Sequence, residues 1–342
     1  MDARNARLVR LLDDQDGLFT QKQVAPLGYP WSRVRHHIDT GRWVRVLHGV
    51  YSASAGPLTR GRLLRAALLY GGSSSVLSHD TAAEEWGLTR VDGRVAMSDP
   101  IHITVPYGRS AVNAEPTTLS AAVHGGHPVS GVGEVIHPGV AVHRSRAMNH
   151  IVHASVLPRT SLADTALDIA TAADTPRAAM TSLVGSLTSR RVSLHDIRDR
   201  IEKRPPFRYR KQIDDAVQWV ADGVQSVLEL RYVLDVELAH GLPSGKKQSP
   251  VAVDGRTLYE DVDYTPHGVP LIVRLDGQQF HSSAGVVFRD RRRDNAAELA
   301  DRPRLVFGWQ DVDSDPCAVA RDVAQVLRRE GWTGSMHPCA RE

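Results

Sequence analysis

Acidic residues gather around one predicted hairpin in the last third of the chain. Asp263 lies near the end of a predicted strand, 257–264, and Asp276 ends the next strand, 270–276. The turn-forming sequence Thr-Pro-His-Gly lies between them. Because antiparallel strands return beside one another, we expect these carboxylates to converge, with Glu229 on the preceding helix completing an acidic pocket. Oxygen ligands gathered in this way favour Mg²⁺ or Mn²⁺, which can activate water for phosphodiester hydrolysis.

A second set of candidate residues is basic and lies near the N-terminus. Residues 1–65 hold eleven Lys or Arg against five Asp or Glu, whereas the whole chain has a net charge of only +3. The candidates for contact with DNA are Ser32, Arg33, Arg35, His36, Arg42 and Arg45. One helix face cannot bury Arg33, Arg35 and His36 together without great cost, so we expect them to face solvent or a ligand. The alternative is a solvated basic face that serves protein contacts.

The elements around these basic residues predict a winged helix-turn-helix. Helices are expected at 4–14, 21–27 and 31–40, followed by two short strands within 43–51 around a His-Gly turn. In such a motif the second helix of the helix-turn-helix enters the major groove, and the wing can reach the phosphates. The sequence therefore predicts double-stranded DNA as the partner of this module.

The remaining sequence mixes helices and strands and predicts a multi-domain α/β protein. Helices are expected at 58–70, 76–87, 162–173, 176–189, 193–203, 226–240, 289–300 and 316–330, and further strands at 101–105, 140–143 and 304–309. Pro205-Pro206 is the best candidate boundary. The expected division is a winged-helix domain at 1–55, a mixed α/β middle domain at 56–205, a nuclease-like α/β domain at 206–333 and a tail at 334–342.

Cysteine and apolar content restrict the compartment. The only two cysteines, Cys317 and Cys339, cannot form a disulfide framework or a cysteine-based zinc site. The first ten residues lack the apolar segment of a signal peptide, and no apolar run reaches the ~18 residues that a membrane helix needs. We therefore expect a cytoplasmic protein without a membrane partner.

Six histidines crowd one region, and their spacing matches no known set of metal ligands. They are His124, His127, His137, His143, His150 and His153. Most of them lie in stretches rich in Gly and Pro, so the sequence favours surface histidines, and a metal site is the alternative.

The N-terminal segment resembles a known family. The stretch from Gly17-Leu18-Phe19-Thr20 to Leu47-His48-Gly49-Val50-Tyr51 is similar to the N-terminal domain of the type IV toxin–antitoxin abortive-infection antitoxins. The resemblance covers about 50 residues. It implies binding to operator DNA and, for an antitoxin, a cognate toxin as a partner.

Residues 226–330 resemble the very-short-patch-repair endonuclease-like branch of the PD-(D/E)xK nucleases. The likeness runs from Asp263 through Leu275-Asp276-Gly277 and His281 to the stretch 289–294 and the strand 305–309. It implies a restriction-endonuclease-like α/β fold. In that fold Asp263, Asp276 and the Leu275 carbonyl would hold the metal, His281 would be the catalytic histidine, Asp290 would orient it, and Glu229 would match the acid on the opening helix. Arg289, Arg292 and Arg293 would hold DNA phosphates.

One departure from the nuclease pattern leaves two functions open. Many relatives have Glu where this chain has Arg274, and a cation there would repel a metal. The first hypothesis is a Mg²⁺-dependent DNA endonuclease or nickase, for which a neighbouring methyltransferase would be the expected partner. The second is a non-catalytic transcriptional regulator or antitoxin-like repressor with a degenerate nuclease domain.

Overall fold

The computed structural model describes residues 3–54, 56–88, 99–118, 135–189, 191–253, 255–277, 295 and 297–338. The chain forms two compact units. Unit 1 comprises Met1–Ala172 with Arg200–Pro205, and unit 2 comprises Ala173–Asp199 with Pro206–Glu342. The chain passes finally from one unit to the other between Pro205 and Pro206, where the sequence suggested a boundary. The division into three domains stays a prediction.

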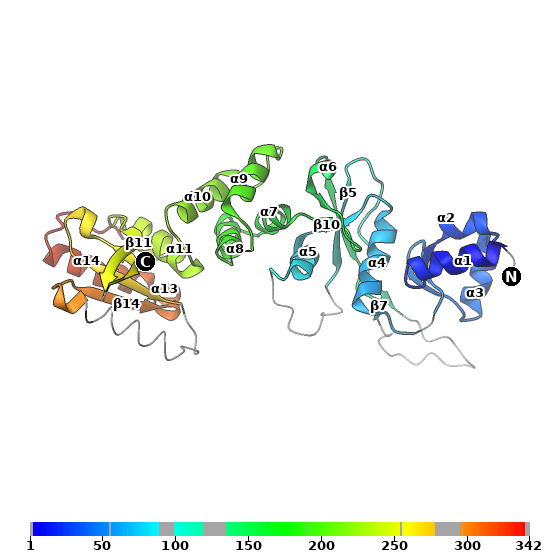
Figure 1. Cartoon of the computed structure of the whole chain (residues 1–342), viewed down its shortest axis with the longest axis horizontal. Coiled ribbons are helices and arrows are strands. Elements are labelled where there is room, and N and C mark those ends of the chain that lie inside the picture. Colours follow the sequence, from blue (N-terminus) through cyan, green and yellow to red (C-terminus); the bar gives the residue numbers. More distant parts are fainter. Residues whose placement is uncertain are drawn as a thin grey trace. The chain divides into compact units, whose positions relative to one another are not determined.

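Unit 1 begins with the expected winged helix (Figure 1, blue). Its elements are α1 (Ala3–Asp14), β1 (Leu18–Thr20), α2 (Gln21–Val24), the 3-10 helix η1 (Ala25–Leu27), α3 (Trp31–Asp39), β2 (Val44–Leu47) and β3 (Val50–Ser52). The strands form a sheet in the order β1-β3-β2. Thr20 starts α2 with a capping box, in which its hydroxyl and the Gln23 side chain satisfy each other's backbone N–H groups. The three predicted helices and the hairpin are confirmed.

The winged helix shares a hydrophobic core with the next helix, α4 (Arg60–Gly71). Leu18 from β1 and Val46 and Val50 from the wing pack in one buried cluster with Leu63 and Leu64 of α4. Polar contacts join the same elements, since Arg65 pairs with Asp16 at 2.8 Å and Arg62 donates to Ser52 at 2.7 Å. The winged helix therefore packs on α4.

A five-stranded sheet forms the centre of unit 1, in the order β8-β5-β4-β10-β9. Its strands are β4 (Val76–Leu77), β5 (Ile101–Pro106), β8 (Val140–Ser145), β9 (Val152–His153) and β10 (Arg159–Thr160). β5 and β8 run parallel, and β4 and β5 antiparallel. The helices are α5 (His79–Trp86), α6 (Met148–Ile151) and α7 (Leu162–Ala172), and β6 (Thr117–Thr118) pairs with β7 (Val135–His137). The strands expected at 101–105 and 140–143 are confirmed, whereas the helix expected at 76–87 begins as strand β4.

Buried ion pairs explain why residues 200–205 belong to unit 1. Asp164 of α7 has no exposed surface, and Arg200 and Arg204 contact its carboxylate at 3.0 and 3.2 Å. Arg204 also reaches Asp168, at 2.6 Å. These contacts hold the end of helix α9 (Leu194–Lys203) and the residue after it against α7.

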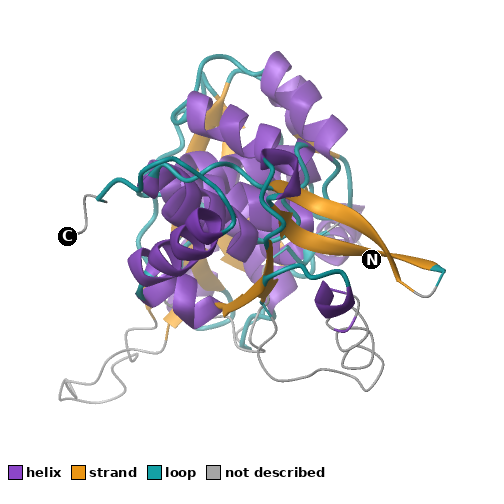
Figure 2. Cartoon of the chain, turned by 90° about the vertical axis from the view of Figure 1, so that its left-hand side faces the viewer, coloured by secondary structure: helices purple, strands orange, loops and turns teal. Residues whose placement is uncertain are grey.

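Unit 2 is built on a four-stranded sheet in the order β11-β12-β13-β14. The strands are β11 (Lys246–Val253), β12 (Arg256–Asp263), β13 (Ile272–Asp276) and β14 (Arg304–Gly308). The first three are antiparallel neighbours, and β13 and β14 are parallel. Figure 2 shows the β11–β12 hairpin as two long strands. Its turn contains Gly255 with a left-handed φ of +72°, as expected for an Asp-Gly hairpin turn.

Helices complete unit 2. They are α8 (Pro176–Thr188), the first part of α9, α10 (Arg210–Ala221), α11 (Val227–Arg231), the π-helix η2 (Tyr232–Leu238), the 3-10 turn η3 (Thr265–His267), α13 (Trp309–Ser314) and α14 (Pro316–Arg329). Val319, Val323 and Leu327 of α14 join Tyr232 and Val273 in the core. The helix expected at 226–240 is present, but its second half widens into π turns. The helix predicted at 289–300 lies mostly outside the described residues.

The mixed α/β architecture with an N-terminal winged helix is confirmed. Within the described ranges, no helix is both long enough and apolar enough to cross a bilayer.

Candidate nucleic-acid interface

Helix α3 turns one side to the core and the other to solvent. Its buried side chain is Val34, which packs with Phe19 and Trp43. The four candidates on this helix, Ser32, Arg33, Arg35 and His36, are all exposed. The structure therefore brings the predicted side chains to one open helical surface, in the first turns after Pro30.

The two arginines of α3 have partners that bind them weakly. The Arg33 guanidinium lies 4.3 Å from the centre of the Tyr29 ring, which is a cation–π distance. Arg35 forms an ion pair with Asp39 at 3.6 Å, and the two side chains are 69% and 65% exposed. Surface pairs of this kind are worth about 0–1 kcal/mol, so an arginine can exchange its partner for a phosphate or a base edge at little cost.

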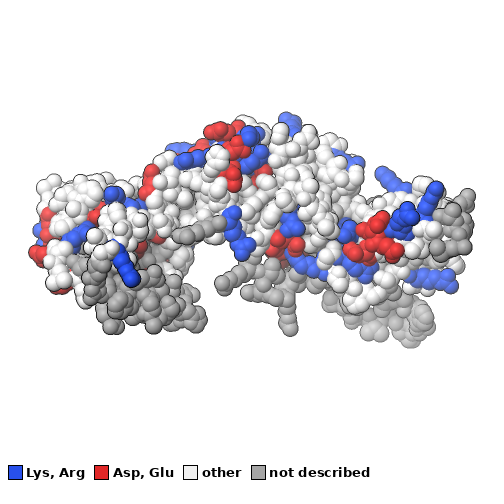
Figure 3. Space-filling model, viewed as in Figure 1, with Lys and Arg blue, Asp and Glu red and all other residues white. Residues whose placement is uncertain are grey.

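The wing adds the remaining two arginines. Arg42 follows α3, Arg45 lies on β2, and both are exposed. Arg45 Nη2 lies 3.0 Å from His48 Nδ1 in the hairpin turn. Figure 3 shows Lys and Arg side chains projecting from this N-terminal module. All six candidate DNA contacts thus lie on the surface of one small module, although their role stays a prediction.

His37 lies on the side of α3 that packs against Trp43. Its ring lies 4.3 Å from the Trp43 ring, centre to centre. Burial lowers the pKa of His37, and the nearby charge of Arg42 lowers it further. A neutral imidazole therefore packs beneath the cationic surface and adds no charge to it at neutral pH.

A comparison with protein families shows what this module is similar to. The family described as "Transcriptional regulator, AbiEi antitoxin" matches residues 6–53. The N-terminal module is similar to this antitoxin-type regulator domain. The match begins in α1 and ends just after β3, so it contains both α3 and the wing. A search of the curated proteins finds no match. The N-terminal part of the earlier resemblance is confirmed, and the nuclease part stays a prediction.

The acidic hairpin differs from expectation, because the register separates Asp263 from Asp276. Asp263 pairs with Ile272 on β13, four positions before Asp276. At ~3.3 Å per residue, this offset is about 13 Å along the strand. Asp276 is exposed at the end of β13, next to Gly308 of β14. The two carboxylates therefore do not converge.

Asp263 has other partners. Its Oδ1 accepts hydrogen bonds from Arg302 Nη2 at 2.8 Å and from the Thr265 amide at 2.9 Å. Burial alone would raise the pKa of Asp263, but the hydrogen bonds from Thr265 and the charge of Arg302 together lower it. This carboxylate is ionised and already neutralised by a guanidinium, so as arranged it does not fit a magnesium ion.

A different aspartate, Asp261, contacts the predicted residue Leu275 and is linked to Glu229 through Gln248. Its Oδ2 accepts from the amide of Leu275 at 2.8 Å, and Gln248 reaches both Asp261 and Glu229, at 3.4 and 3.5 Å. Burial raises the pKa of Glu229, and the charge of Asp261 adds to the rise. Sequence reasoning missed Asp261, although it stands only two positions before Asp263 on the same strand.

Glu229 also has a structural role at the start of α11. It accepts from the Gln225 amide at 2.9 Å and from the Ser226 hydroxyl at 3.0 Å, while Ser226 in turn accepts from the Glu229 amide. This reciprocal arrangement satisfies N–H groups that a helix start leaves unpaired. Capping of α11 therefore accounts in part for the buried Glu229 carboxylate, and no ligand is needed for that part.

Arg274 is buried and does not face solvent. It is 6% exposed, and its guanidinium donates to Glu260 at 2.9 and 3.1 Å. The remaining predicted residues of the nuclease pattern, His281, Asp290, Arg289, Arg292 and Arg293, lie outside the described residues. Their predicted roles stay predictions.

The histidines predicted to lie on the surface divide into two groups. His150 and His153 are exposed as expected. The prediction is wrong for His137, which is fully buried, and His143 is half-buried on β8. His124 and His127 lie outside the described residues.

Proposed function

We propose that the protein is a transcriptional regulator of the antitoxin type, which binds its own operator DNA through α3 and the wing. One observation carries the proposal. The segment that matches the regulator family, residues 6–53, is the segment that exposes Arg33, Arg35, Arg42 and Arg45 together.

Each element has a distinct part in DNA binding under this proposal. The first turns of α3 enter the major groove, where Arg33 and Arg35 donate to guanine edges. Arg42 and Arg45 contact backbone phosphates, which hold the module in register without reading sequence. Because phosphate contacts release counterions, affinity falls as salt rises.

Binding to the DNA upstream of the protein's own gene tests the proposal. We expect Arg33→Ala combined with Arg35→Ala to weaken binding by at least about 30-fold, since each arginine that contacts a base contributes about 1–3 kcal/mol. The measurement is fluorescence anisotropy at a fixed salt concentration. The matched control is Arg328→Ala combined with Arg329→Ala, which removes two exposed arginines from α14 and the same net charge. Equal affinities of the two double variants would overturn the proposal.

An antitoxin-type regulator also implies a cognate toxin as partner. A nucleotidyltransferase gene beside this one, whose product is neutralised on co-expression, would support that assignment. A neighbouring methyltransferase gene would instead favour a nuclease.

A second candidate function is metal-dependent DNA cleavage with Mg²⁺ or Mn²⁺, and one observation favours it. Gln248, which reaches both Glu229 and Asp261, has a left-handed φ of +48°. Such strain in a non-glycine residue is concentrated at functional sites. The candidate ranks second because Asp263 does not fit a metal.

Nicking of supercoiled plasmid with either ion tests this second candidate. Cleavage that Asp261→Asn abolishes and Asp263→Asn leaves intact would support a site at Asp261. No nicking above that of Asp261→Asn would exclude the activity.

A further inference from the structure

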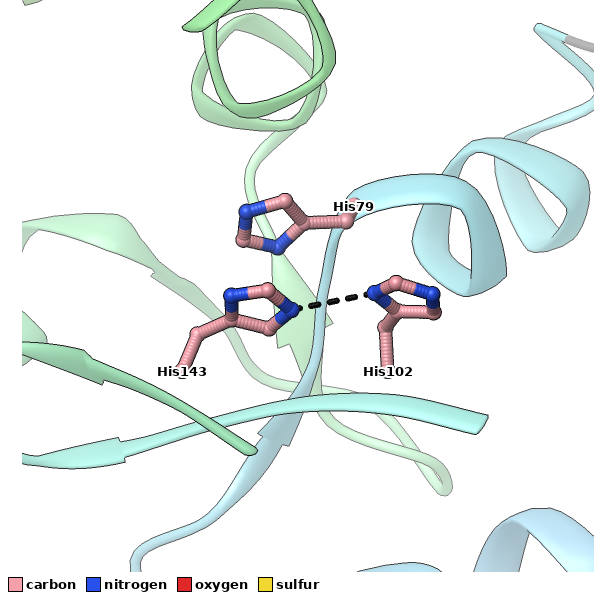
Figure 4. A group of neighbouring side chains, drawn as sticks. All are labelled: His79, His102 and His143. Carbon is pink, nitrogen blue, oxygen red and sulfur yellow. Dashed lines mark hydrogen bonds between the residues drawn. The ribbon is translucent and has the colours of Figure 1, made fainter. Parts of the chain in front are cut away.

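Three histidines from distant parts of unit 1 meet at one point (Figure 4). They are His79 at the start of α5, His102 on β5 and His143 on β8. One ring nitrogen from each lies within 4.8 Å of the others, and all three residues are half-buried. Neither the regulator family match nor the proposed DNA contacts involve these residues.

The fold places the three rings together through strand register. β5 and β8 are parallel neighbours, with His102 opposite Ala141 and His143 two residues further on. Because side chains alternate along a strand, His102 and His143 lie on the same face of the sheet. His79 lies two residues after the end of β4, which is the other neighbour of β5.

The backbone of His79 is strained, with a left-handed φ of +49° in a residue that has a Cβ. This conformation is maintained although His79 is the first residue of the helix, where ordinary helical angles would serve. A strained residue that carries its side chain into a cluster of two similar side chains indicates a functional constraint at this position.

The distances fit nitrogen ligands around one ion. His102 Nδ1 lies 3.0 Å from His143 Nε2, and the His79 ring is stacked on the His143 ring with centres 3.6 Å apart. Two nitrogens bound to one tetrahedral zinc ion lie about 3.3 Å apart, given Zn–N bonds of about 2.0–2.1 Å. The His102–His143 spacing is within a few tenths of an ångström of that value, and rotation of the stacked His79 and His143 rings would bring their lone pairs onto the same ion.

Charged groups of both signs lie around the cluster. Asp80, Glu84 and Asp99 act on His102, whereas Arg204 lies near His79. An imidazole in its neutral form keeps a lone pair for a cation, so each of the three rings can serve as a ligand.

We propose that His79, His102 and His143 bind a divalent transition-metal ion, with Zn²⁺ as the expected ion. Three imidazole ligands without thiolates suit zinc and its neighbours in the transition series rather than magnesium or calcium. Three protein ligands leave a fourth position of a tetrahedral ion open to water or another small ligand. This is the coordination of reactive zinc sites, whereas structural sites usually have four protein ligands.

Metal titration of the full-length protein tests the site. After treatment with EDTA and its removal, the wild type is titrated with Zn²⁺ against a chromophoric chelator, and separately with Co²⁺, whose visible spectrum reports tetrahedral coordination. We expect one Zn²⁺ bound per chain and a tetrahedral Co²⁺ spectrum. If the wild type cannot take Zn²⁺ from the chelator, the proposal is overturned. The three histidines would then only pack against one another.

Single variants locate the ion. His102→Ala and His143→Ala should each weaken Zn²⁺ binding by more than the roughly 10–100-fold that loss of an outer partner costs. His150→Ala, an exposed histidine of the same unit, is the matched control and should bind Zn²⁺ like the wild type. Undiminished binding by His102→Ala and His143→Ala would place the ion elsewhere and overturn the proposal.

Thermal unfolding keeps the test decisive if a variant folds poorly. Saturating Zn²⁺ should raise the Tm of the wild type and of His150→Ala, because a ligand that binds only the folded state stabilises it. A wild-type Tm that Zn²⁺ does not change contradicts the proposal whatever the variants do.

Discussion

Cationic side chains of the winged helix and of unit 2 are in opposite situations. Arg33 and Arg35 are exposed: Arg33 lies over the Tyr29 ring and donates to the Gly28 carbonyl at 3.4 Å, and Arg35 pairs with a surface carboxylate. Lys247 and Arg274 are buried, and each is paired with a buried carboxylate: Lys247 with Glu237 at 2.7 Å, and Arg274 with Glu260 at 2.9 Å. The difference shows that a basic residue is available to a polyanion where its charge stays exposed and is at most weakly paired.

The buried pairs also limit what can be removed from unit 2. Burial lowers the pKa of Lys247, while the adjacent Glu237 raises it. Glu237 also accepts from Tyr264, whose hydroxyl contacts that of Tyr232 at 2.9 Å. A buried charge stripped of its partner is costly, although the intact pair itself adds little to stability.

The largest change in stability is expected when Lys247 is removed from its buried ion pair. Lys247→Met leaves Glu237 buried without its cation and should lower the free energy of unfolding by about 3–5 kcal/mol. Urea unfolding followed by tryptophan fluorescence measures it. The matched control is Lys246→Met on the same strand, which is exposed and should change the value by less than about 0.5 kcal/mol. Similar losses in the two variants would mean that the buried pair has no special role.

A buried histidine of unit 1 extends the comparison to pH. His137 Nδ1 accepts from the Gly139 amide at 3.1 Å, so Nε2 carries the proton toward the Leu63 carbonyl. Burial lowers the pKa of His137 to about 4. Because this value is below the unfolded one, the contribution is complete above about pH 6.5 and is lost as pH falls toward 4, by about 3 kcal/mol.

NMR of ring-labelled histidine checks this pKa directly, with His137→Asn to assign the signal. We expect the His137 signal to be unchanged between pH 8 and pH 6. A midpoint near the ordinary value of 6.5 would show that its ring is hydrated and that this part of the comparison fails.

A smaller effect is expected where the charge is exposed. Arg45→Ala should leave the free energy of unfolding within about 0.5 kcal/mol of the wild type and reduce the slope of log affinity for DNA against log salt by about 1. Anisotropy titrations at several salt concentrations give the slope. An unchanged slope would remove Arg45 from the phosphate contacts.

The smallest expected effect concerns the ion pair of α3. Asp39→Ala releases Arg35 and removes a negative charge from the proposed DNA surface. Stability should change by no more than about 0.5 kcal/mol, because the pair is an exposed i,i+4 contact, and DNA binding should become slightly tighter. Weaker DNA binding by this variant would show that Asp39 positions Arg35 for contact.

Sequence periodicity predicted the winged helix, because short amphipathic helices and a hairpin with a glycine turn leave local signals. Strand β1 was missed since three residues carry no period. Strand β11 was missed because its polar residues and Pro250 are typical of a loop. Its burial of Lys247 depends on Glu237, which the chain places ten residues earlier.

The sites were harder to predict because register and long-range contact define them. Asp261 and Asp263 stand two positions apart on the same strand, so the sequence alone does not distinguish them. Only the register of β12 on β13 shows which carboxylate lies beside Leu275. The histidine cluster leaves no short sequence motif, since His102 and His143 are 41 positions apart. Chain separations of this size are informative only once the strand order is known.

The shared core between the wing and α4 bears on how this winged-helix module can be reused. A fragment that stops at residue 55 keeps the whole family match but uncovers Leu18, Val46 and Val50, which pack against Leu63 and Leu64. A designer who transplants the module into a chimaeric repressor should therefore cut after Gly71, so that the helix beneath it travels with it.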